Sequence, residues 1–112
     1  MLLVVVTLAA YWRVTSHGFV DYDDGDYVFG NSHVQAGLTW AGVKWAFLTG
    51  HASNWHPMTW LSHELDVTLF GKTPGGHHLT SVFWHCANAV LAFLALRALT
   101  GANWKSLFVA GL

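Results

Sequence analysis

Hydrophobic residues are concentrated in three stretches of this chain: its first residues, a long run near its end, and its last residues. The run from Leu79 to Leu99 is apolar almost throughout, and at about 1.5 Å per residue it would extend roughly 30 Å, the thickness of the hydrocarbon core of a bilayer. This pattern predicts a transmembrane helix over residues 79–99. The apolar last residues, 104–112, predict the start of a further transmembrane helix that is truncated.

The apolar first residues predict another transmembrane helix, over residues 1–14, which is clipped at its start. A signal peptide is the alternative for such a short apolar segment. Signal peptides begin with a basic region, and no Lys or Arg precedes Leu2. The clipped helix is therefore the favoured interpretation.

Residues 15–78 form a long polar loop between the first two predicted helices. Its first part, Ser16 to Val34, is rich in Asp, Gly, Asn and Tyr and predicts irregular or briefly extended structure. Its last part, Lys72 to Gly76, predicts a turn that leads into the next transmembrane helix.

Two short amphipathic helices are predicted within the loop. One begins after Thr39, a good capping residue, and ends at Gly50, and the other runs from Pro57 to Gly71. The second helix carries an apolar stripe of Met58, Leu61, Leu65 and Leu69 and an opposite face of Ser62, His63 and Asp66. Its tryptophans and those of the first helix suit either a bilayer interface or a small packed core, and the pattern leaves both open.

Basic residues predict the orientation of the chain in the membrane. Arg97 and Lys105 flank the short connection after residue 99, whereas the loop 15–78 is acidic overall. Because cytoplasmic connections carry an excess of Lys and Arg, the short connection is predicted to be cytoplasmic and the loop extracytoplasmic. Arg13, at the outer end of the first helix, argues against this orientation.

Composition supports lipid as the solvent. Of the 112 residues, 54% are hydrophobic and only 10% are charged, which is unlike a soluble domain. The net charge of −1 excludes a strongly basic nucleic-acid-binding protein. The single cysteine, Cys86, allows no intrachain disulfide. The predicted fold class is an all-α membrane protein, a fragment of a multi-pass helix bundle.

The acidic segment Asp21-Tyr22-Asp23-Asp24-Gly25-Asp26 is the most informative polar cluster. Crowded carboxylates suit a general base or a cation site, although a solvated acidic turn explains them equally well. A calcium loop is excluded, because its sixth position would be Asp26 rather than Gly and its twelfth Ser32 rather than Glu. The segment is therefore a candidate catalytic turn.

Eight histidines are many for this length, but their spacing does not match a known zinc motif. His63-Glu64 begins like a metalloprotease helix, yet Val67 stands where the second histidine would be. His56 and the pair His77-His78 are the histidines that we expect to approach one another across the loop. No metal or other cofactor is predicted.

Three segments together resemble one family. They are Phe19 to Asp24, Asn54-Trp55-His56-Pro57-Met58-Thr59-Trp60-Leu61-Ser62-His63, and Gly75-Gly76-His77-His78-Leu79, followed by His85. They are similar to the N-terminal region of bacterial membrane proteins with C-terminal tetratricopeptide repeats, which are relatives of the eukaryotic transmembrane O-mannosyltransferases. The resemblance covers nearly the whole chain.

This resemblance implies a GT-C type glycosyltransferase, which takes a sugar from a polyprenyl-phosphate carrier on the outer side of the membrane. It implies Asp23 as the base for the acceptor and Asp24 as its support, and it makes His56 and His78 candidates for binding the carrier phosphate or substrate. His56-Pro57-Met58 stands in place of an Arg-Pro-Leu segment, so a permanent positive charge is lost. Ser81 replaces a usual Asn.

The expected protein is thus an inner-membrane glycosyltransferase fragment, inactive by itself, whose partners are the bilayer, a polyprenyl-phosphate sugar such as a mannose donor, and a protein or other acceptor. Two rivals remain open. A non-catalytic membrane scaffold for tetratricopeptide repeats would leave the acidic turn merely solvated. A transporter would place polar residues or broken helices in later spans.

Overall fold

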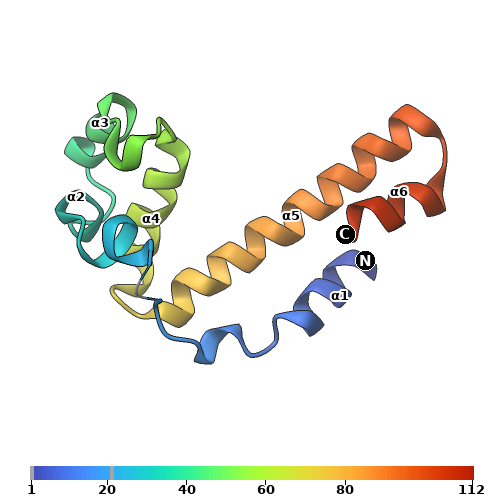
Figure 1. Ribbon diagram of the computed structural model, residues 1–112, viewed down its shortest axis with the longest axis horizontal. Coiled ribbons are helices and arrows are strands. Elements are labelled where there is room, and N and C mark those ends of the chain that lie inside the picture. Colours follow the sequence, from blue (N-terminus) through green and yellow to red (C-terminus); the bar gives the residue numbers. More distant parts are fainter. Residues whose placement is uncertain (1, 21) are drawn as a thin grey trace. The chain divides into compact units, whose positions relative to one another are not determined.

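The computed structural model describes residues 2–20 and 22–112, and within them every regular element is helical. The α-helices are α1 (Leu2–Ala10), α2 (Ser32–Gln35), α3 (Trp40–Leu48), α4 (Pro57–Phe70), α5 (Pro74–Thr100) and α6 (Asn103–Ala110) (Figure 1). Short 3-10 turns lie at Val14–Ser16 and His51–Ser53, and a π-helical turn, η2, lies at Gly25–Phe29. The all-helical prediction is confirmed for the residues that the structure describes.

The chain divides into two compact units. The residues up to Val14 together with His78–Leu112 form one, which we call the terminal unit, and Thr15–His77 form the other, which we call the central unit. Each unit is described by itself below.

The terminal unit is built on α5, a single unbroken helix in Figure 1. Among the described residues it is the one helix long and apolar enough to cross a membrane, with a mean hydropathy of 1.7 over its best window. Directly after α1, the Tyr11 ring makes an edge contact with the His85 ring of α5 at a centroid distance of 5.7 Å, so the end of α1 lies beside α5. The hydroxyls of Thr100 and Ser106, 3.3 Å apart, join the end of α5 to α6.

The predicted turn over residues 72–76 is wrong in its extent, because α5 already begins at Pro74. Proline has the backbone angle of a first helical residue, and it therefore starts the helix. The two glycines that follow are needed for close packing. A Cβ on Gly75 would lie 2.6 Å from the Thr15 carbonyl oxygen, and one on Gly76 would collide with the Phe70 ring.

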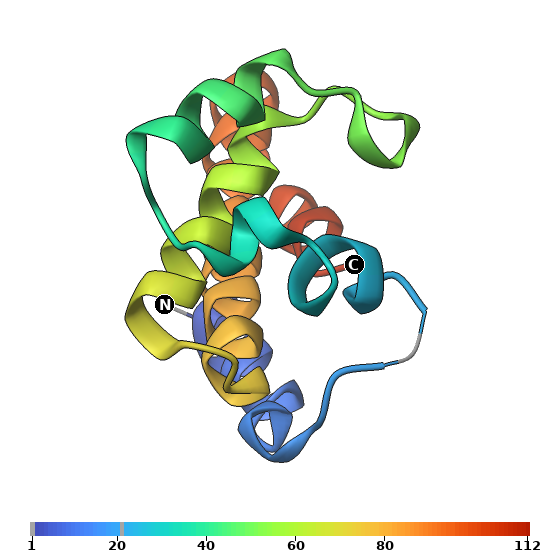
Figure 2. The same cartoon turned by 90° about the vertical axis from the view of Figure 1, so that its left-hand side faces the viewer.

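In the central unit α2 and α3 pack against α4 (Figure 2). Both predicted loop helices are confirmed. The Thr39 hydroxyl accepts a hydrogen bond of 3.0 Å from the Gly42 N–H and caps α3, whereas α4 begins at Pro57 and ends before Gly71, whose φ is +60°. The buried apolar core consists of Val34, Ala46 and Trp60.

The prediction of irregular or extended structure over Ser16 to Val34 is only partly confirmed. The second half of this segment is helical, with the π-helical turn η2 followed by α2. Asn31 explains the start of α2, because its side-chain oxygen accepts hydrogen bonds from the N–H groups of His33 and Val34. The capping signal outweighs the low helix propensity of the surrounding residues.

The structure shows a small packed core that takes up some of the loop tryptophans and leaves others exposed. Trp60 is fully buried and Trp45 packs against the core, whereas Trp40 and Trp55 are exposed. Most of the apolar stripe of α4 is also exposed, namely Met58, Leu65 and Leu69. The side of α4 that is buried instead carries Trp60, Glu64 and Asp66.

Candidate functional site

The acidic segment forms a compact turn at the start of η2. One oxygen of Asp24, Oδ2, accepts a hydrogen bond of 2.7 Å from the Val20 N–H, and the Asp23 carbonyl oxygen accepts one of 2.9 Å from the Tyr27 N–H. The Asp23 side chain is exposed and that of Asp24 is partly buried. Asp21 lies outside the described residues. The two predicted catalytic carboxylates therefore differ: Asp24 fixes the turn, and Asp23 faces solvent.

Tyr27 attaches this acidic turn to α4. Its ring stacks on the Trp60 ring at a centroid distance of 4.9 Å, with 25° between the planes. His56, at the N-terminus of α4, lies 5.5 Å from the Tyr27 ring and 4.8 Å from the Trp60 ring. The fold thus brings the predicted residue His56 to the helix turn that follows Asp23 and Asp24.

His63 lies on the same side of α4, with its ring 6.2 Å from that of Tyr27. Burial lowers the pKa of the His63 imidazole, and the Asp66 carboxylate opposes this shift. His77 and His56 lower the His63 pKa further, whereas the charge of Asp24 raises it. These electrostatic effects identify Asp24, His56, Asp66 and His77 as the titratable neighbours of His63.

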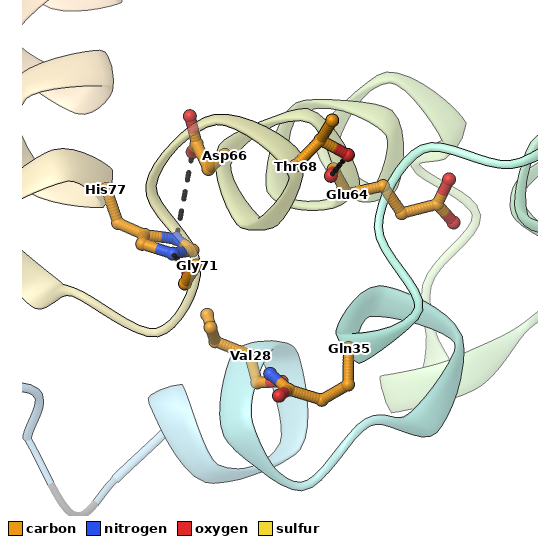
Figure 3. A network of polar contacts seen from close by, with 7 residues as sticks. All are labelled: Val28, Gln35, Glu64, Asp66, Thr68, Gly71 and His77. Carbon is orange, nitrogen blue, oxygen red and sulfur yellow. Dashed lines mark hydrogen bonds and ion pairs between the residues drawn. The ribbon is translucent and has the colours of Figure 1, made fainter.

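Asp66 and His77 face one another across the turn between α4 and α5 (Figure 3). The distance from His77 Nδ1 to Asp66 Oδ2 is 3.8 Å, and both residues are buried, with 4% and 3% of their surfaces exposed. His77 Nε2 lies 3.0 Å from the Gly71 carbonyl oxygen, to which it donates a hydrogen bond in the matching tautomer. This bond fixes the orientation of the imidazole ring.

His78 belongs to the terminal unit and is partly buried. Of the predicted site residues, Asp23, Asp24 and His56 are therefore the three that belong to the central unit. The structure brings Asp24 and His56 around a residue, His63, that sequence reasoning did not select.

The sequence also provided no indication that Asp66 and His77 form a pair. His77 was instead paired with His56 and His78. A signal did exist, because His63 and Asp66 are three residues apart and must share one face of a helix. The missing information was the tight turn at Gly71, which brings α5 back against this face.

The arrangement can support two kinds of chemistry. An exposed carboxylate, Asp23, can accept a proton from an acceptor hydroxyl. The imidazoles of His56, His63 and His77 can bind an anion when protonated or a metal ion when neutral. The stacked rings of Tyr27 and Trp60 provide a rigid support for both groups.

A comparison with curated proteins finds one protein similar over most of this chain. Protein O-mannosyl-transferase Tmtc1 of Drosophila melanogaster is 32% identical over 96 residues, which cover 80% of this chain and 11% of that protein. The chain therefore spans about a tenth of the length of this relative. No family model matches the chain, and no solved structure matches it significantly. The chain is a partial homologue of an O-mannosyl-transferase, which supports a relation to that family.

Proposed function

We propose that this chain is part of an integral-membrane GT-C type glycosyltransferase that moves a sugar, mannose in the first instance, from a polyprenyl-phosphate carrier to a protein or other acceptor outside the membrane. The observation that carries the proposal is the similarity to an O-mannosyl-transferase over 80% of the chain. The acidic turn packed against the histidine-bearing side of α4 supplies the residue types that such a transfer needs.

In this proposal Asp23 is the general base. Its exposed carboxylate accepts the proton of the acceptor hydroxyl while that oxygen attacks the anomeric carbon of the sugar, and the carrier phosphate leaves. Asp24 supports this role by holding the turn through its hydrogen bond with Val20. His56 contributes an imidazole for the carrier phosphate or substrate, and His78, in the terminal unit, is a separate candidate for this role.

The membrane is the natural place for a carrier with a polyprenyl chain. The α5 helix has the length and composition to cross a bilayer. The exposed rings of Trp40 and Trp55 and the exposed stripe of α4 offer apolar contacts to isoprene units at the bilayer surface. We place the central unit outside the cell's inner membrane, with further spanning helices beyond this chain completing the bundle.

The test is sugar transfer from a polyprenyl-phosphate mannose by the full-length protein in lipid nanodiscs. We expect Asp23→Asn to lower the transfer rate about 10²–10⁴-fold, because the amide cannot take the acceptor proton. Asp24→Asn keeps an oxygen that can accept the Val20 hydrogen bond. It should therefore lower the transfer rate less than Asp24→Ala does.

Asp26→Asn is the matched control. Asp26 is an exposed carboxylate of the same turn, and its removal changes the charge as Asp23→Asn does but should leave the rate within about twofold. Transfer at the wild-type rate by a folded Asp23→Asn protein would show that Asp23 is not the base. No transfer by the full-length wild-type protein with any polyprenyl-phosphate sugar would favour a non-catalytic scaffold.

A further inference from the structure

The side chains of His63, Asp66 and His77 converge in the central unit. Each offers one ligand atom, and these three atoms lie within 4.8 Å of one another. His63 and Asp66 come from adjacent turns of α4, and His77 comes from the first turn of α5. The convergence is therefore made by two helices and the short turn that joins them, rather than by one sequence motif.

We propose that His63, Asp66 and His77 form a binding site for a divalent transition-metal ion. Two imidazoles and one carboxylate are the ligands of many zinc sites, and they are too rich in nitrogen for Mg²⁺ or Ca²⁺, which prefer oxygen ligands. Three protein ligands leave a coordination position open to water or another small ligand.

One distance within the cluster is close to the spacing of ligands in a metal site, and the others are no longer than 4.8 Å. Ligand atoms around a tetrahedral zinc ion lie about 3.4 Å apart, because each is about 2.0–2.2 Å from the metal. His77 Nδ1 and Asp66 Oδ2 are 3.8 Å apart, which is too long for a hydrogen bond and slightly wider than this spacing. Small side-chain rotations of the three residues would close the site around an ion.

The surroundings of the cluster also suit a metal ion. Ligating histidines in metal sites usually donate their second ring N–H to a carbonyl or carboxylate, which fixes the ligand nitrogen. The Gly71 carbonyl oxygen, 3.0 Å from His77 Nε2, can do this for His77 and leaves Nδ1 directed at Asp66 (Figure 3). His63 Nδ1 is buried and has no hydrogen-bond partner.

A simple ion pair between Asp66 and a protonated His77 is the competing explanation. It uses two of the three residues and leaves the position of His63 to the three-residue spacing that puts it on the same face of α4 as Asp66. A metal ion accounts for all three side chains.

The test is Zn²⁺ binding by the whole 112-residue chain in lipid nanodiscs, prepared without a histidine tag. We expect one equivalent of Zn²⁺ after dialysis, measured by elemental mass spectrometry, and a titratable site by calorimetry. Each of His63→Gln, Asp66→Asn and His77→Gln should weaken binding at least about tenfold. His17→Gln, which changes an exposed histidine elsewhere in the same unit, should leave the affinity unchanged.

Because the three residues are buried or partly buried, a variant can also lose its fold, so the wild-type chain provides a second measurement. We expect Zn²⁺ to raise its Tm and a chelator to reverse the rise, since an ion that binds only the folded state stabilises it. The proposal is overturned if the wild-type chain shows neither stoichiometric binding nor a rise in Tm. It is equally overturned if folded variants of all three residues bind as the wild type does. These outcomes concern binding alone, so they leave the proposed glycosyl transfer to its own test.

Discussion

At the scale of single residues, the two neighbouring aspartates of the acidic turn have separate tasks. Composition and spacing do not distinguish Asp23 from Asp24, and only the resemblance to a family implies Asp23 as the base. In the structure Asp24 accepts the Val20 hydrogen bond, which leaves Asp23 exposed. A base that meets an incoming acceptor must be accessible, whereas a residue that orients it can be tied into the backbone. This difference favours Asp23 as the base.

Glu64 is a second residue with a distinctive environment. Its carboxyl group is buried against Gly42 without a hydrogen-bond partner, and burial raises its pKa. Since the folded-state pKa lies above the unfolded one, the unfolded chain releases this proton first as the pH rises. The folded state is therefore progressively destabilised from the ordinary glutamate pKa up to the raised one.

We expect Glu64→Gln to stabilise the chain by at least about 1 kcal/mol at neutral pH, because it removes a buried charge and nearly keeps the side-chain volume. The advantage should shrink as the pH falls below the ordinary glutamate pKa. The measurement is the Tm of the wild-type and Glu64→Gln chains in detergent, from below the ordinary glutamate pKa up to neutral pH. Equal Tm differences at all pH values would show that folding does not raise the pKa of Glu64.

Gly42 is the counterpart of Glu64 on α3. A Cβ at this position would lie 2.5 Å from a Glu64 carboxylate oxygen. We expect Gly42→Ala to lower the free energy of unfolding by about 1–3 kcal/mol, despite the higher helix propensity of alanine. Chemical denaturation checks this, with Gly50→Ala as the control because nothing lies near a Cβ there. A stabilised Gly42→Ala protein would contradict the close packing of α3 on α4.

At the scale of helices, local sequence signals were sufficient to predict where α3 and α4 begin and end. They were insufficient to predict the other elements of the central unit. Thr39, Pro57 and Gly71 mark helix ends through interactions within a few residues, and the structure agrees. Which face of α4 is buried could not be predicted from such local interactions. Most of its apolar stripe is exposed, whereas Asp66 on its polar face is buried, because Tyr27 and α5 supply partners that lie far away in sequence or beyond a turn.

In the candidate site, too, some of the residues could be selected from the sequence, whereas the contacts between them could not. Asp23, Asp24 and His56 are implied by resemblance to a family. The proximity of Asp24 and His56 to His63 depends on the stacking of Tyr27 on Trp60. The pairing of Asp66 with His77 depends on where α5 begins, and the sequence suggested a longer turn before it. Periodicity alone does not contain such contacts between elements.

The N-terminal cap of α3 allows a test at this scale. We expect Thr39→Ala to lower the free energy of unfolding by about 1 kcal/mol, because the Gly42 N–H loses its side-chain acceptor. Thr59→Ala on the exposed surface of α4 should change it by less than about 0.5 kcal/mol. Equal effects of the two substitutions in chemical denaturation would contradict the capping role of Thr39.

At the scale of the whole molecule, the chain combines a helix able to cross a membrane with a separate helical unit. The basic residues Arg97 and Lys105 predict that the connection between α5 and α6 is cytoplasmic. Under the proposed orientation, the central unit would lie on the opposite side, where a lipid-linked sugar and an acceptor would meet.

Cysteine labelling in intact cells tests this orientation. In a Cys86→Ala background, we expect Lys72→Cys to react with a membrane-impermeant maleimide, because Lys72 is exposed on the central unit. Ala102→Cys, between α5 and α6, should react only after permeabilisation. The reverse pattern would place the central unit in the cytoplasm and remove it from the proposed outer-side transfer.

Photo-crosslinking with a diazirine-bearing polyprenyl-phosphate sugar is the most direct test that the central unit belongs to a carrier-binding site. The full-length protein in nanodiscs is irradiated, and the labelled peptides are identified by mass spectrometry. We predict labelled peptides within residues 22–78, and competition by the unmodified carrier. Competable labelling confined to peptides outside the central unit would contradict the account.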